Sequence, residues 1–170
     1  MKKDTFLMYG IICGVVSIII SLVVYMANAM FTPGVNYISY AAMLAIIIIN
    51  NIAYSKANDG FVTFGNVFKS GFKASAVAGA IVVVWSIASL YIMPDMKATI
   101  MENMAKEMNK QQNLPDEQIE MAMKMTEKFW SYFMVLGVIA YSLGAGAIFS
   151  LIGAAIAKKK GERPFTADTF

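Results

Sequence analysis

The chain has 170 residues, of which 58% are hydrophobic and only 15% are charged. Soluble globular domains are about half apolar and about one quarter charged, and a chain this short cannot hide such an excess in its core. The composition therefore excludes an ordinary soluble domain and predicts a lipid environment. The single cysteine and the lack of histidine leave no internal disulfide framework and remove the commonest general base and metal ligand.

Four long apolar runs follow one another, at residues 6–30, 35–54, 74–93 and 129–157, and none contains Asp, Glu, Lys or Arg. A helix needs about 20 apolar residues to cross a hydrocarbon core about 30 Å thick. Only helices and closed barrels satisfy their backbone groups in lipid, and these runs are too long for barrel strands. We therefore predict an all-α membrane protein with four transmembrane helices, forming a single domain over residues 1–170.

The first run also has features of a cleaved secretion signal. Lys2 and Lys3 precede it, and Ala27-Asn28-Ala29 at its end resembles a small-residue cleavage site. Its apolar stretch is longer than the core of a usual signal peptide, which spans about 7–15 residues. The length favours an uncleaved membrane anchor.

The second connection ends in an amphipathic segment that leads into the third span. Thr63 is suited to the N-cap of a helix, because its hydroxyl can accept a backbone N–H of the first turn. Phenylalanines recur beyond it at spacings of three and four, which places them on one helix face: Phe61, Phe64, Phe68 and Phe72. We expect this segment to lie at the membrane surface.

The third connection, residues 94–128, is the one substantial polar region between the runs. Its first part has an apolar residue at every fourth position, which predicts a helix with one apolar stripe: Met96, Ile100, Met104 and Met108. The segment Asn113-Leu114-Pro115-Asp116 breaks this helix, and Pro115 suits the first turn of a second one. We expect the second helix to continue without a break into the fourth span, so that residues 94–128 form a helical hairpin.

Basic residues sort to one side of the membrane if the chain has four spans. That side holds nine basic and four acidic residues, whereas the 94–128 segment holds five basic and seven acidic ones. Cytoplasmic loops are enriched in Lys and Arg, so we expect cytoplasmic termini, an extracytoplasmic hairpin and a bacterial inner-membrane location. Near the C-terminus, the basic residues that we expect to contact anionic lipid headgroups, rather than nucleic acid, are Lys158, Lys159 and Lys160.

Small residues recur at every fourth position in several of the spans, which lets helices approach closely. The predicted helix-packing residues are Gly10, Gly14, Gly71, Ser75, Gly79, Gly146, Ser150 and Ala154. The spacing is compatible with contacts within one chain or between two copies. Asn28, Asn50 and Asn51 could mark a substrate path or bond to neighbouring helices, and the position of Asn50 and Asn51 near a span end favours helix bonding.

The sequence Met121-Ala122-Met123-Lys124-Met125 resembles alternating Met motifs that bind copper(I) through thioethers. On a helix, however, Met123 points away from the face that Met121 and Met125 share, and Met also fills packed faces. The structural interpretation is therefore preferred. The chain shows no catalytic constellation, metal cluster or cofactor motif, and we expect a protein that is not an enzyme.

A short motif ahead of the third span, GFVTFGNVFKSGF at residues 60–72, is typical of one membrane family. Pro94 after that span and the sequence GAAIAKKK at residues 153–160 are also similar to it. On these features the chain resembles an uncharacterised membrane family of Bacteroidetes-type bacteria, known as domain of unknown function 4199. The resemblance implies four spans and an inner-membrane location, and it implies no activity.

Two classes of function stay open beside the leading hypothesis. The leading one is a structural or interaction component of the envelope, whose hairpin associates with a second copy or with an envelope protein. A small transporter or channel component would need a polar cavity between the spans. A lipid-acting membrane enzyme would need clustered polar groups at an interface.

Overall fold

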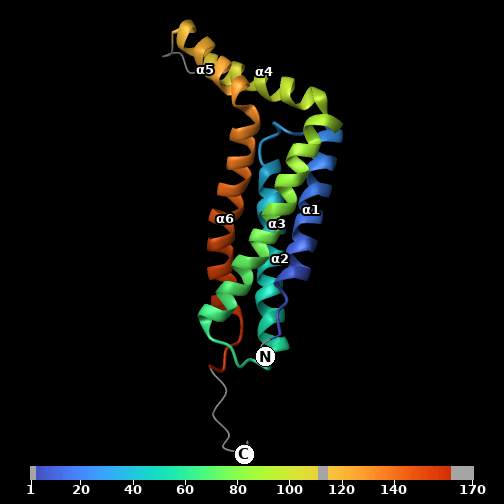
Figure 1. The fold of residues 1–170 in the computed structure, drawn as a ribbon, viewed down its shortest axis with the longest axis vertical. Helices are drawn as coiled ribbons and strands as arrows, with labels where there is room; N and C mark the ends of the chain where they lie inside the picture. Colours follow the sequence, from blue (N-terminus) through green and yellow to red (C-terminus); the bar gives the residue numbers. More distant parts are fainter. Residues whose placement is uncertain (1–2, 111–114, 162–170) are drawn as a thin grey trace, which may run out of the picture. The chain divides into compact units, whose positions relative to one another are not determined.

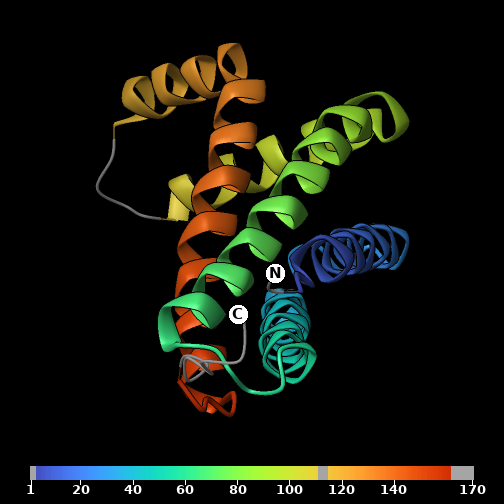
Figure 2. The same cartoon turned by 60° about the horizontal axis from the view of Figure 1, so that its bottom comes forward.

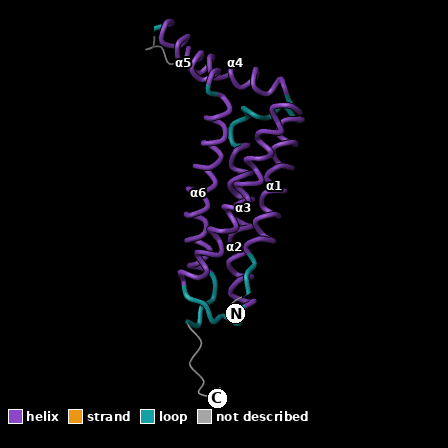
Figure 3. The backbone as a smooth tube through the Cα atoms, viewed as in Figure 1, coloured by secondary structure: helices purple, strands orange, loops and turns teal. Residues whose placement is uncertain are grey.

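The computed structural model describes residues 3–110 and 115–161. The break expected at Asn113-Leu114 and the basic residues Lys2 and Arg163 lie outside the described residues. Figure 3 shows only helices and connecting loops in the part that is described. The six helices are α1 (Phe6–Met26), α2 (Val35–Ala57), α3 (Phe64–Ile92), α4 (Pro94–Lys110), α5 (Asp116–Lys128) and α6 (Trp130–Ile156).

Four of these helices, α1, α2, α3 and α6, are long and apolar enough to cross a membrane. This finding confirms the all-α class and the four candidate spans. The ends differ in detail from the apolar runs, because α1 ends at Met26 and α2 continues to Ala57.

Asn28 explains the early end of α1. It adopts a left-handed conformation, with φ of 50°, and its N–H donates to the Tyr25 carbonyl at 3.0 Å. The N–H of Ala29 donates to the Val24 carbonyl at 3.0 Å. This is the Schellman pattern that ends helices, with Asn in the position that glycine most often takes. Asn28 therefore terminates a helix.

The same pattern ends α2. Asp59 has φ of 57°, its N–H donates to the Lys56 carbonyl at 3.0 Å, and the N–H of Gly60 donates to the Ser55 carbonyl at 2.8 Å. Both motifs satisfy backbone carbonyls that a helix end otherwise leaves without partners.

The amphipathic segment and the third apolar run form one uninterrupted helix, α3. Thr63 caps it as predicted, because the backbone N–H of Asn66 donates to the Thr63 hydroxyl oxygen at 3.3 Å. Two of the recurring phenylalanines, Phe68 and Phe72, stack with ring centroids 5.9 Å apart.

The expectation of a continuous helix from α5 into α6 is wrong. α5 ends at Lys128, Phe129 has φ of −107° and ψ of 18°, and α6 begins at Trp130. Phe129 still donates its N–H to the Met125 carbonyl at 3.0 Å. The chain thus turns at one residue while keeping a helical hydrogen bond, and no Gly or Pro in the sequence indicates the turn.

The described chain divides into two compact units. The first contains α1, α2, residues 64–82 of α3 and residues 140–156 of α6. Within it, α1 and α2 lie side by side (Figures 1 and 2). Its core has two clusters: Cys13, Met43, Ile47, Ala74 and Ala78 form one, and Tyr54, Val62, Val67, Ala154 and Ala157 form the other.

The second unit, residues 83–139, contains α4 and α5. The two helices contact each other, and an ion pair joins Lys97 Nζ of α4 to Glu127 Oε1 of α5 at 3.5 Å. Ile119 of α5 is buried.

Candidate functional site

Two features of the structure are candidates for function, one in each unit. The first is a group of polar side chains inside the first unit, which we call the amide cluster: Thr5, Asn50, Asn51, Ser70 and Ser150. The second is a face of α5, which we call the α5 face: Glu117, Glu120, Met121, Lys124, Met125 and Lys128.

Asn50 links three helices in the amide cluster. Its side chain is fully buried, at 0% exposure. Its oxygen accepts a hydrogen bond from the Thr5 hydroxyl, just ahead of α1, at 2.8 Å. Its nitrogen donates to the Ser70 hydroxyl of α3 at 3.2 Å and to the Asn51 oxygen at 3.3 Å. All these hydrogen bonds of the Asn50 amide are thus made to other protein groups.

Asn51 is held between glycines of two other helices. A Cβ on Gly71 of α3 would lie 2.5 Å from the Asn51 oxygen, and a Cβ on Gly153 of α6 would lie 2.5 Å from its nitrogen. That nitrogen donates to the Ser150 carbonyl of α6 at 3.1 Å. Glycine at both positions leaves room for the amide in this conformation, so Asn51 of α2 lies in close contact with α3 and α6.

Ser150 completes the cluster in an unusual way. Its side chain is fully buried, and its hydroxyl has no hydrogen-bond partner in the part of the chain that the structure describes. A Cβ on Gly71 would lie 2.8 Å from this oxygen. The hydroxyl is therefore packed against the backbone of α3, where two small residues let the helices meet.

The remaining predicted helix-packing residues also lie at close approaches. A Cβ on Gly10 would lie 2.8 Å from the Ala74 carbonyl oxygen, and one on Gly14 would lie 2.9 Å from the Ile81 Cβ. On α3 and α6, Gly79 faces Ser142, Gly146 faces Ser75, and Ala154 is buried in the second core cluster. The structure thus brings these residues together across α1, α3 and α6 within one chain.

Sequence reasoning missed a set of polar contacts at the end of this unit. Asn58 donates from its nitrogen to the carbonyls of Lys3 at 3.0 Å and Tyr54 at 2.8 Å, and its oxygen accepts from the Lys3 N–H at 2.9 Å. The Ser55 hydroxyl donates to the Lys158 carbonyl. The signal that could have found them is the presence of Ser55 in the last turn of α2 and of Asn58 immediately after it.

The three lysines predicted to contact lipid have different surroundings. Lys159 turns its ammonium back onto the end of α6 and donates to the carbonyls of Ala154 at 2.5 Å and Ala157 at 2.8 Å. Lys160 places its ammonium 5.2 Å from the centre of the Phe61 ring. Lys158 is exposed. Lys160 is exposed as well, and the contact of these lysines with lipid headgroups stays a prediction.

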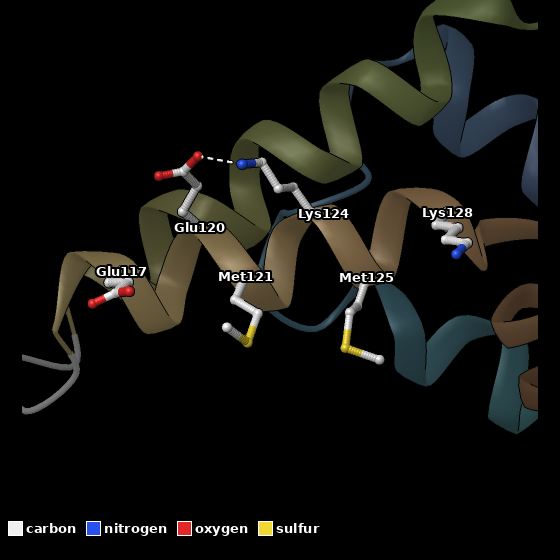
Figure 4. A pocket seen from close by; sticks show the side chains of 6 residues that line it. All are labelled: Glu117, Glu120, Met121, Lys124, Met125 and Lys128. Atoms are coloured by element: carbon white, nitrogen blue, oxygen red, sulfur yellow. Dashed lines mark ion pairs between the residues drawn. The ribbon is translucent and has the colours of Figure 1, made fainter.

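The α5 face carries two exposed methionines beside charged residues (Figure 4). Met121 is 61% exposed and Met125 is 54% exposed, and both side chains point to the same side of the helix. A shallow groove of about 400 Å³ runs along this face. Met123 is half-buried and does not line this groove, so the groove contains only two of the three methionines of the alternating motif.

In Figure 4 the side chains of Glu120 and Lys124 extend to the opposite side of α5 from those of Met121 and Met125. Glu120 Oε1 and Lys124 Nζ form an ion pair at 2.6 Å (Figure 4). The hydrogen bond from Lys124, together with its charge, lowers the pKa of the Glu120 carboxyl below its ordinary value. The carboxylate therefore stays ionised at neutral pH. The described residues contain no group of three or more His, Cys, Asp or Glu side chains that could hold a metal ion.

Four apolar spans with interhelical polar contacts define a multi-pass helical membrane protein. The family described as a protein of unknown function (DUF4199) matches residues 8–159. The chain belongs to this family. Comparison with curated proteins and with solved structures gives no match.

Proposed function

We propose that this protein is a non-enzymatic interaction component of the bacterial inner membrane, and that α4 and α5 form an extracytoplasmic hairpin that docks onto another protein. The observation that carries this proposal is the α5 face, where Met121 and Met125 are more than half exposed and the other four lining residues are charged. Exposed methionines are adaptable contact residues at protein interfaces.

The orientation rests on charge. Nine basic residues fall on the side of the termini, which is the pattern of cytoplasmic segments. Lys158 then meets anionic headgroups of the inner leaflet.

The state of the amide cluster supports an interaction function over a transport path. The amides of Asn50 and Asn51 are bonded to Thr5, Ser70 and the Ser150 carbonyl. A transport path needs polar groups that are available to a substrate, and these two amides are used in joining helices.

Site-specific photo-cross-linking in intact cells tests the proposal. A photoreactive amino acid at Met121 or Met125 should give discrete adducts with a protein, identified by mass spectrometry. The matched control position is Asn109, which is exposed on α4 outside the α5 face. Equal, diffuse labelling from all three positions, or no protein adduct from either methionine position, would contradict the proposal.

A further inference from the structure

The charges of the α5 face change sign along the helix. Glu117 and Glu120 lie toward its start, Lys124 and Lys128 lie toward its end, and Met121 and Met125 lie between. Glu120 and Lys124 are paired with each other, but Glu117 and Lys128 take part in no ion pair with any described residue. Lys128 Nζ lies 5.5 Å from the centre of the Phe129 ring. The face therefore has a negative end and a positive end, and neither Glu117 nor Lys128 is neutralised by an ion pair with a described residue.

We propose that α5 binds the α5 of a second copy of this chain, with the two helices antiparallel about a two-fold axis near Met123. This inference rests on the proposed function, because it names the partner of the same docking face. A two-fold axis brings one patch against itself, so a patch can pair in this way only if it is self-complementary. A face that is acidic at one end and basic at the other meets that condition when one helix is reversed.

The spacing of the residues fits this arrangement. Eleven positions separate Glu117 from Lys128, which is about 16 Å along a helix. With the axis near Met123, Met121 of one copy lies opposite Met125 of the second copy. Glu117 then lies beside Lys128 of the second copy, and the same contact repeats at the other end.

The charge pattern favours a second α5, rather than a lipid surface, as the partner of the α5 face. A lipid surface offers headgroups of one prevailing sign, which would favour one end of the face and repel the other. A second α5 offers both signs in the required order. Two helices of 13 residues bury less surface than a standard soluble interface, but confinement of both copies in one membrane raises their effective concentration.

Cysteine cross-linking tests the direction of the pairing. Cys13→Ala gives a cysteine-free background, since Cys13 is the only cysteine. Glu117→Cys and Lys128→Cys chains with different tags are then co-expressed and oxidised in membranes. We expect cross-links between position 117 of one chain and position 128 of the other, in excess over links between two identical positions. Excess links between identical positions would mean parallel pairing and would overturn the proposal.

The matched control uses an acid and a base of α4. Glu102 and Lys106 are both exposed and form an ion pair at 2.6 Å, as Glu120 and Lys124 do. Cysteines at positions 102 and 106 should give only background cross-linking. Cross-linking as strong as that between positions 117 and 128 would overturn the proposal, because it would reflect random collision.

Charge reversal tests complementarity without cysteines. Glu117→Lys or Lys128→Glu alone places like charges together at both ends of the dimer and should weaken self-association roughly tenfold. The double variant restores opposite charges and should recover most of that loss. Self-association is measured by energy transfer between labelled copies in vesicles of phosphatidylethanolamine and phosphatidylglycerol. A double variant as weak as either single variant would overturn the proposal.

Two further outcomes separate this inference from the proposed function. Photo-adducts of Met121 that contain only a different protein would overturn the α5 pairing and leave the docking function in place. Quenching of a fluorophore at Met121→Cys by bromine-labelled lipids, without energy transfer between copies, would place the face in lipid and overturn both.

Discussion

Asn51 shows how one polar residue sets the geometry of several spans. Its amide lies between Gly71 and Gly153 and donates to the Ser150 carbonyl. In lipid, an amide without partners is costly, so arrangements that separate these helices are disfavoured. The hydrogen bond from Asn51 to the Ser150 carbonyl therefore favours the observed packing of α2 against α6.

Replacing Asn51 by alanine should therefore destabilise the protein. Loss of the amide bonds and of the side-chain volume should cost about 1–2 kcal/mol. Thermal unfolding in detergent micelles measures this cost. Asn36→Ala is the matched control, because Asn36 is on the same helix and exposed. Equal melting temperatures for the two variants would contradict the assigned role of Asn51.

Glycines of one helix should respond oppositely to alanine. A Cβ on Gly146 would lie 2.5 Å from the Ser75 Cβ, so Gly146→Ala should force α3 and α6 apart and cost about 1–3 kcal/mol. Gly144 has no described heavy atom within 4 Å of such a Cβ. Gly144→Ala should be neutral, or stabilise α6 by up to about 1 kcal/mol. The free energy of unfolding of both variants tests this difference, and an equal change in the two variants would contradict it.

The sequence predicts such residues only in part. Spacing of four marks Gly146 and Ser150 as small residues on one face. Spacing cannot tell which helix they meet, because the partners, Ser75 and Asn51, are far along the chain. Gly153, which the pattern omits, makes one of the closest approaches.

At the scale of elements, the ends of α1 and α2 are determined by single residues in left-handed conformations. Asn28 and Asp59 end α1 and α2 in left-handed conformations without glycine. Asn and Asp tolerate this conformation, but the same residues are also common in turns and caps. The apolar runs therefore predict where the spans lie and leave their last residues undetermined.

The end of α6 depends on Lys159. Its ammonium donates to the carbonyls of Ala154 and Ala157 and faces the negative end of the helix dipole. Lys159→Met keeps the apolar stem and removes the charge. The free energy needed to open the last turn should therefore fall by about 0.5–1 kcal/mol. Hydrogen exchange of that turn measures the opening.

Lys158→Met is the matched control, because the exposed Lys158 side chain does not cap the helix. It should leave hydrogen exchange of the last turn unchanged. Faster exchange in Lys158→Met than in Lys159→Met would reverse the assignment.

The periodicity of apolar residues does not predict the turn at Phe129. Apolar spacing runs from α5 into α6 without interruption, and the backbone leaves helical geometry at one residue only. Residues that break helices by their own chemistry are visible in a sequence. The turn at Phe129 has no such residue, so the sequence pattern does not indicate it.

At the scale of the molecule, the four spans and the polar third connection could be predicted from composition and length alone. In lipid, a span must hydrogen-bond its own backbone N–H and C=O groups, which a helix does. The length of an apolar run is therefore a strong predictor of a transmembrane helix. The charge pattern supports the proposed orientation, which the protein structure by itself does not show. The proposed docking face rests on the exposure of Met121 and Met125, and that exposure is known only from the three-dimensional arrangement of α5.

Cysteine labelling tests the proposed orientation. In the Cys13→Ala background, Asn109→Cys should react with a membrane-impermeant maleimide in spheroplasts. Lys56→Cys should react only after the membrane is opened. Both positions are exposed, which makes the two variants matched probes. The reverse result would place the termini outside and contradict the orientation.

The amide cluster also has a consequence for how the chain is made. Asn51 and the Ser150 carbonyl are 99 positions apart, so the amide enters the membrane long before its partner is synthesised. A chain interrupted before α6 exposes that amide to lipid or to whatever factor shields it. We expect such chains to be recognised and degraded. The hydrogen bond between Asn51 and the Ser150 carbonyl would then distinguish complete chains from interrupted ones.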